Sequence, residues 1–169
     1  SYSCDIIVRK KGLCWHIKEN IITFAFILKN SKFIMIHKSD ILVIGGGIAG
    51  MSYALRVANS GKYRVTLVCK TKLNEANTTK AQGGIASVTN LLVDNFEKHI
   101  ADTMVAGDFI SDHCAVEHVV RNAPEAITDL VNWGVNFDKN SKGAYDLHRE
   151  GGHSEFRILH HADDTGAEI

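Results

Sequence analysis

The chain has 169 residues, 45% of them hydrophobic, which is typical of one globular domain and excludes a disordered chain. Its 19 basic and 19 acidic residues leave no net charge, which argues against nucleic acid or an anionic membrane as a partner. The 4 cysteines include no CxxC pair, which argues against a zinc site or a disulfide scaffold and favours a reducing, cytoplasmic location.

The first 37 residues form a leader to which we assign no chemistry. They are rich in Lys, Ile and Phe, and they keep no helical or strand period. Their longest apolar stretch, residues 21–28, is far shorter than the roughly 20 residues of a membrane helix, so we expect no membrane span. A start at Met35 would put a strand at the amino terminus. We therefore predict that residues 1–37 are an extension outside the fold and that residues 38–169 form the domain.

The segment after the leader predicts a strand, a helix and a second, parallel strand. Apolar runs occupy residues 41–44 and 65–69, with a helical segment at 48–59 between them. A GxGxxG pattern made of Gly45, Gly47 and Gly50 lies directly after the first strand and opens the helix. Such glycines permit a tight turn, a close approach of the backbone to a pyrophosphate, and close packing of helix on strand. We predict an α/β, Rossmann-like dinucleotide-binding fold.

The residues after the second strand bear on which dinucleotide is bound. NAD sites usually carry an acid about 20 residues after the glycines, but Cys69 and Lys70 stand there. Lys70 suits either the extra phosphate of NADP or a flavin dinucleotide. Residues 74–88 combine hydroxyl and amide side chains with a glycine pair, which suits the edge of a flavin ring, although an ordinary polar loop fits them equally well.

The rest of the chain contains predicted structural helices and a histidine-rich segment. Residues 93–105 have helical spacing, and Asn122 with Pro124 predicts the start of a helix that ends at Gly134. Residues 148–161, HREGGHSEFRILHH, hold 4 of the 9 histidines. The possible ligands His148, Glu150, His153, His160 and His161 show no tight spacing such as HExxH, so we predict no metal site.

Three segments carry a resemblance to a known family: DILVIGGGIAG, NTTKAQGGIASV and EGGHSEFRILHHADDTG, which begin at Asp40, Asn77 and Glu150. From about Ser39 to Ile169 the chain resembles the succinate dehydrogenase and fumarate reductase flavoproteins, and within that family the L-aspartate oxidase branch. The resemblance implies an incomplete Rossmann-like FAD-binding domain of the glutathione-reductase type. It also implies that the beginning of a capping or substrate domain follows, and that this amino-terminal fragment is inactive alone because the catalytic arginine lies beyond it.

Two positions favour the aspartate oxidase branch. Asn77 stands where the respiratory enzymes carry the histidine that binds flavin covalently, so the resemblance implies non-covalent FAD. Glu150 stands where they carry an uncharged residue, and a carboxylate suits the ammonium group that distinguishes aspartate from succinate.

The resemblance also assigns roles to individual residues. Cofactor contacts fall to Gly45, Gly46, Gly47, Ile48, Ala49, Gly50, Lys70, Asn77, Thr78, Thr79, Lys80, Ala81, Gln82, Gly83 and Gly84. Glu150 orients the substrate amino group. His153 and Ser154 lie near the substrate or brace their loop.

The implied activity is FAD-dependent oxidation of L-aspartate to iminoaspartate, the first step of NAD biosynthesis, with oxygen or fumarate as electron acceptor and quinolinate synthase as the downstream partner. Two alternatives stay open. One is a fragment of a fumarate reductase or succinate dehydrogenase flavoprotein, and the other is a non-catalytic NADP-binding Rossmann module.

Overall fold

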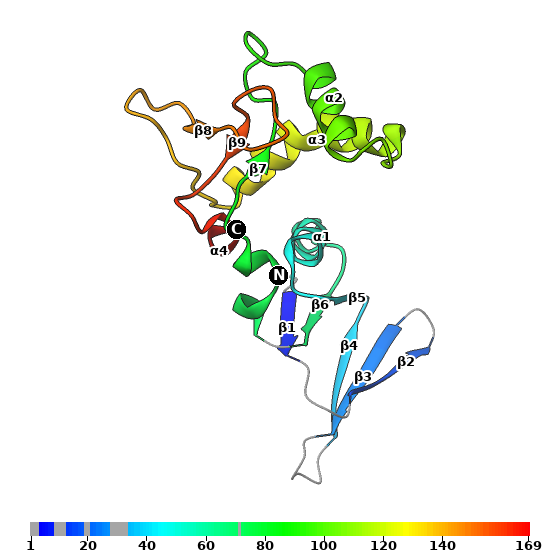
Figure 1. Cartoon of the computed structure of the whole chain (residues 1–169). Coiled ribbons are helices and arrows are strands. Elements are labelled where there is room, and N and C mark those ends of the chain that lie inside the picture. The colour runs from blue at the N-terminus through cyan, green and yellow to red at the C-terminus, as the bar shows by residue number, and fades with distance from the viewer. Residues whose placement is uncertain (1–3, 9–12, 19–20, 28–33, 71) are drawn as a thin grey trace. The chain divides into compact units, whose positions relative to one another are not determined.

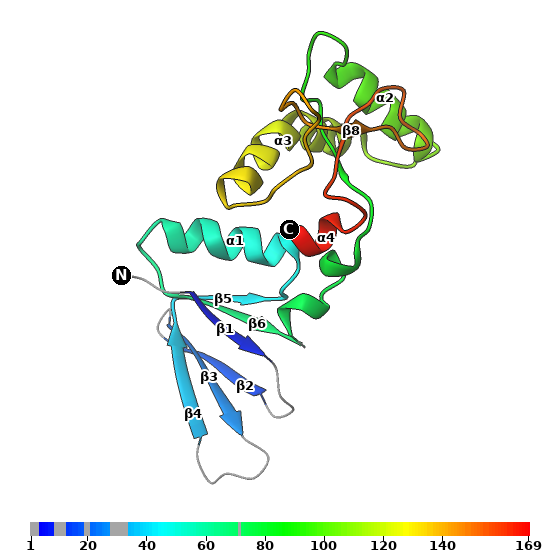
Figure 2. The same ribbon diagram turned by 90° about the vertical axis from the view of Figure 1, so that its left-hand side faces the viewer.

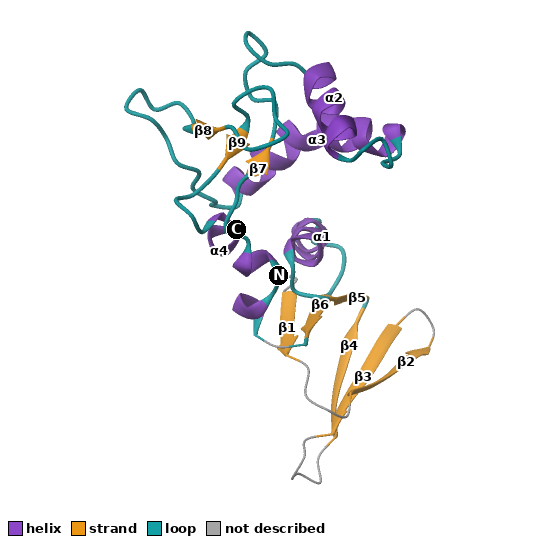
Figure 3. Cartoon of the chain, viewed as in Figure 1, coloured by secondary structure: helices purple, strands orange, loops and turns teal. Residues whose placement is uncertain are grey.

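A computed structural model describes residues 4–8, 13–18, 21–27, 34–70 and 72–169 (Figure 1). The chain forms two compact units, residues 1–78 and 79–169. The first unit carries two sheets and one long helix, whereas the second carries two long helices and much loop (Figure 3). No helix in these described ranges has the length and apolar content that crossing a bilayer requires.

The first unit contains the predicted strand, helix and strand at the predicted bounds. They are β5 (Ile41–Ile44), α1 (Ile48–Asn59) and β6 (Val65–Cys69), and the two strands pair in parallel. Helix α1 covers one face of this sheet (Figure 2). Ala54 of the helix is buried against Val43 and Leu67 of the strands. The prediction of a Rossmann-like fold is confirmed.

Part of the leader pairs with this sheet. Strand β1 (Cys4–Val8) lies parallel to β6 on the side away from β5. A separate antiparallel sheet contains β2 (Leu13–Lys18), β3 (Ile21–Ile27) and β4 (Ile34–Ser39). The sequence predicts that residues 1–37 lie outside the fold, whereas Cys4–Val8 shares a sheet with β5 and β6. The origin of the leader stays a prediction.

The second unit is built on a small antiparallel sheet and two helices. The sheet has the order β7 (Ile85–Ala86), β9 (Ile158–Leu159) and β8 (Leu147–His148). The helices α2 (Phe96–Ala106) and α3 (His113–Asn132) pack together through Ile100, Val116 and Val120. The short helices of the chain are η1 (Leu73–Glu75), η2 (Thr78–Lys80) and α4 (Thr165–Glu168).

Helix α3 corrects the predicted helix start at Asn122. The helix begins ten residues earlier with Asp112 as its cap, and Pro124 lies inside it. An interior proline costs a helix about 3 kcal/mol. Four buried aliphatic side chains on one face, each worth about 1.5–3 kcal/mol, offset that cost; they are Val116, Val120, Ile127 and Leu130. The predicted end is confirmed, because Gly134 follows the helix with a φ of 107°.

Candidate functional site

The glycine turn between β5 and α1 has the geometry that its sequence predicts. Gly45 has a backbone φ of 120°, a conformation that residues other than glycine rarely adopt. A Cβ atom at Gly50 would overlap the carbonyl oxygen of Gly45, so only glycine lets the helix begin this close to the strand. At Gly46, a Cβ would collide with the side chain of Cys69. The turn therefore keeps the backbone bare of side chains.

The amino terminus of α1 is suited to an anion. Gly47 caps the helix without any side-chain hydrogen bond, and the first turn contains no acidic residue. The first amide groups of a helix lack partners within it and carry the positive end of its dipole. A phosphate group placed here would accept hydrogen bonds from the backbone.

The structure brings Thr78 to the glycine turn. The amide of Ile48 donates a hydrogen bond of 3.0 Å to Oγ1 of Thr78. A Cβ at Gly47 would lie 3.3 Å from the same oxygen. Lys70 follows β6 and is exposed, and Asn77 is exposed beside Thr78. The first unit thus gathers the predicted phosphate residues and the start of the predicted flavin segment.

The rest of the predicted flavin segment, residues 79–84, lies in the second unit and leads into β7. A Cβ at Gly84 would overlap the carbonyl oxygen of Leu159, so glycine lets this segment lie against β9. A Cβ at Gly83 would be 3.5 Å from Oε1 of Glu150, whose side chain is exposed. The structure therefore places the predicted substrate carboxylate beside the predicted flavin segment.

A buried arginine holds the EGGHS loop, residues 150–154. The side chain of Arg157 is 0% exposed and donates two hydrogen bonds of 2.8 Å to the carboxylate of Asp94. It donates a third, of 2.6 Å, to Oδ2 of Asp102. The amide and the hydroxyl of Ser154 each donate to that same oxygen at 2.8 Å. Ser154 is therefore fixed to α2 through Asp102.

The electrostatics of this network favour its charged form. Burial by itself raises the pKa of Asp94, but the hydrogen bonds from Arg157 and from the Asn95 amide, together with the charge of Arg157, outweigh it and leave this pKa below its usual value. Burial likewise raises the pKa of Asp102, and hydrogen bonds from Ser154 and Arg157 reverse that shift. Both carboxylates are therefore ionised at neutral pH.

His153 lies at a cavity next to this network. Its ring nitrogen Nδ1 is 3.3 Å from the Arg157 guanidinium, and its ring centroid is 5.6 Å from that of His99. Both histidines line a largely apolar cavity of about 610 Å³ between α2 and α3. Burial, with the nearby charge of Arg157, lowers the pKa of His99. His99 is therefore neutral at pH 7.

Sequence reasoning missed the residues that hold the loop. Arg157 was visible within the RILH segment, but its partners lie 63 and 55 residues away in sequence. Asp94 and Asp102 stand among ordinary helix-start and helix residues, so no local pattern marks them. The pairing follows only from folding, which brings α2 to the loop.

Comparisons with known proteins agree with this geometry. A family described as "FAD binding domain" matches residues 40–169. The chain is 46% identical over 130 residues to a chloroplastic L-aspartate oxidase of Nicotiana tabacum, covering 77% of this chain and 20% of that protein. It is 47% identical over 137 residues to the L-aspartate oxidase of Yersinia pestis, covering 79% of this chain and 25% of that protein.

Solved structures show the same likeness at lower identity. Mycobacterium smegmatis Sdh1 superposes with a TM-score of 0.71 at 31% identity, covering 77% of this chain and 22% of that chain. A quinol-fumarate reductase superposes with a TM-score of 0.71 at 30% identity and the same coverage. The chain therefore spans about a fifth to a quarter of the length of the relatives it matches.

Proposed function

The chain belongs to the FAD-binding domain family, and from that premise we propose that it supplies the pyrophosphate and flavin contacts of an L-aspartate oxidase. The observation that carries the proposal is the position of the Glu150 carboxylate beside Gly83, at the segment assigned to the flavin. A carboxylate there suits a substrate that carries an ammonium group.

The residues assigned to the cofactor have the chemical groups that the parts of FAD require. The bare glycine turn and the start of α1 would hold the pyrophosphate. Lys70 would approach the adenosine half, and residues 77–84 would lie along the flavin. Asn77 is an amide that forms no covalent bond to a flavin, so FAD would be held non-covalently.

Glu150 would select and orient the substrate. Its carboxylate would accept a charge-assisted hydrogen bond from the amino group of L-aspartate, which succinate lacks. FAD held by the glycine turn and residues 77–84 would supply the redox chemistry, as acceptor of the hydride from the substrate α-carbon, with oxygen or fumarate as the final electron acceptor. The residues of this chain contribute orientation and charge.

His153 and Ser154 would have supporting roles. Ser154 uses both its amide and its hydroxyl on Asp102, so it would brace the loop that carries Glu150. His153 contacts the Arg157 guanidinium and would help to hold the EGGHS loop near the substrate. Neither assignment gives these residues a proton transfer in the reaction.

The proposed reaction also indicates a cellular location and an enzyme that uses the product. We infer a cytoplasmic location, and quinolinate synthase as the enzyme that consumes the iminoaspartate. The fumarate reductase alternative draws support from the similar quinol-fumarate reductase structure, but Asn77 and Glu150 favour aspartate.

Substitution of Glu150 tests the substrate assignment in the protein encoded by the complete reading frame. Glu150→Gln keeps the shape and removes the charge, so kcat/KM for L-aspartate should fall by about 10-fold to 100-fold, since a hydrogen bond to a charged group is worth about 1.5–3 kcal/mol. Activity on succinate or fumarate should change little. Glu155→Gln is the matched control, because Glu155 lies in the same segment but pairs with Lys98 at 2.7 Å. Equal losses on all substrates would refute the role of Glu150.

A further inference from the structure

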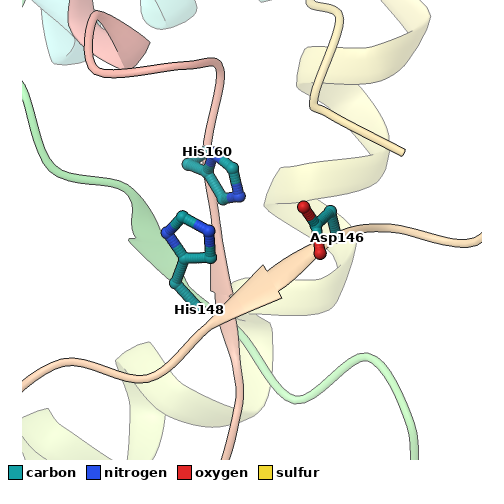
Figure 4. Close-up of side chains that lie close together, drawn as sticks. All are labelled: Asp146, His148 and His160. Atoms are coloured by element: carbon teal, nitrogen blue, oxygen red, sulfur yellow. The ribbon is translucent and has the colours of Figure 1, made fainter. Parts of the chain in front are cut away.

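Three potential metal ligands meet on the small sheet of the second unit: Asp146, His148 and His160. One ligand atom of each lies within 4.8 Å of the other two. Figure 4 shows a ring nitrogen of each histidine on the side that faces the Asp146 carboxylate. We propose that this cluster binds a divalent transition-metal ion, and that zinc is the ion it suits best, since two imidazoles and a carboxylate form a common zinc ligand set.

Strand pairing assembles this site. Asp146 directly precedes β8 and His148 ends it, and residues two apart in extended chain point to the same face. Strand β8 pairs antiparallel with β9, and Leu147 lies opposite Leu159. Continuing this register by one residue puts Asp146 opposite His160. No sequence motif predicts the cluster, because motifs such as HExxH place their ligands on one helix, whereas these residues lie in or next to two paired strands.

His160 is the second, independent indication of a ligand. The residue is 6% exposed, yet neither of its ring nitrogens has a hydrogen-bond partner among the described residues. Buried polar groups are rarely left unpaired in folded proteins, and a bond to a metal ion would satisfy this one. Nδ1 of His160 lies 3.4 Å from Oδ2 of Asp138, near enough for electrostatic attraction but not in the geometry of a hydrogen bond. A carboxylate in that position commonly orients a metal-binding histidine, and it leaves Nε2 for the ion.

The other two ligands can close around an ion. The rings of His148 and His160 are stacked, with centroids 3.6 Å apart and planes inclined by 23°. Tetrahedral zinc with bonds of about 2.0–2.1 Å needs ligand atoms about 3.4 Å apart, so ligand atoms now within 4.8 Å of one another must approach by up to about 1.4 Å. His148 and Asp146 are exposed, which leaves their side chains free to turn and leaves a fourth position open to water.

Zinc binding by the 169-residue chain tests this site without reference to flavin. We expect calorimetric titration of the reduced, metal-free chain with Zn²⁺ to give one site. Asp146→Asn and His148→Ala should each weaken binding at least 10-fold, and because both side chains are exposed, neither change threatens folding. His118→Ala, which removes an exposed histidine on α3, is the control and should leave binding unchanged.

Cobalt supplies a second readout, because the chain also contains 4 cysteines and a cysteine thiolate is itself a good metal ligand. Co²⁺ in the proposed site should show the visible absorption of nitrogen and oxygen ligands without the intense near-ultraviolet band of a thiolate. The proposal would be overturned by absence of zinc binding, by binding that both cluster variants leave unchanged, or by a thiolate band.

Discussion

The glycine turn of the first unit and the EGGHS loop of the second are held in different ways. The turn depends on bare backbone and on a local apolar core, in which Ala54 of α1 packs on Val43 and Leu67. The loop depends on Arg157, a buried cation that joins it to carboxylates 63 and 55 residues away. Residues near in sequence thus position the phosphate contacts, whereas residues far apart position the loop that carries Glu150.

Removing the buried arginine should give the largest effect. Arg157→Met leaves Asp94 and Asp102 without their cation, and breaking a buried ion pair in this way typically costs about 3–5 kcal/mol. Urea unfolding should show the lower free energy of unfolding. Hydrogen exchange under native conditions should be faster in β8 and β9, while the amides of β5 and β6 keep their protection. Arg121→Met, which removes an exposed arginine, should change stability little. Equal losses from both changes would mean that the network does not hold the loop.

Acid should weaken the same network to a smaller extent, because a protonated carboxyl group still accepts hydrogen bonds from Arg157. Against the effect of burial, Ser154 and Arg157 hold the pKa of Asp102 below its usual value, and Arg157 with the Asn95 amide does the same for the pKa of Asp94. Their ionised forms therefore stabilise the fold above the unfolded pKa of about 3.9, and this contribution is lost as the pH falls through the lower folded-state values. The free energy of unfolding of the wild-type chain should fall steeply in that acid range. A profile equally steep in Arg157→Met would contradict this assignment.

Adding a side chain at the glycine turn should destabilise the first unit. Gly50→Ala adds a Cβ that overlaps the carbonyl oxygen of Gly45. Overpacking of this kind lowers the free energy of unfolding by about 1–3 kcal/mol. Exchange should accelerate in β5 and α1, with β8 and β9 unaffected. FAD affinity of the complete protein should fall as well. Tyr53→Ala, on the exposed side of the same helix, is the control and should alter neither quantity.

Removal of the Ser154 hydroxyl should have the smallest effect. Ser154→Ala deletes one hydrogen bond to Asp102, worth about 1 kcal/mol, and keeps the bond from the amide. In the complete protein, KM for aspartate should rise modestly while the turnover rate is retained. A collapse of turnover by two orders of magnitude would show that Ser154 takes part in the reaction itself.

The same contrast explains what the sequence could predict. The bounds of β5, α1 and β6 follow from apolar runs and glycine spacing, which are local signals. The continuous α3 was missed because Pro124 is a strong local signal for a helix start, and only burial along one face overrides it. The Arg157 network and the Asp146, His148 and His160 cluster were missed because strand pairing and helix packing bring their members together.

The most direct test is made on purified protein from the complete reading frame. We predict a flavin absorption band, release of the flavin on denaturation without covalent attachment, and hydrogen peroxide formation that depends on L-aspartate. Oxidation of succinate in place of aspartate, or a protein without flavin, would contradict the account.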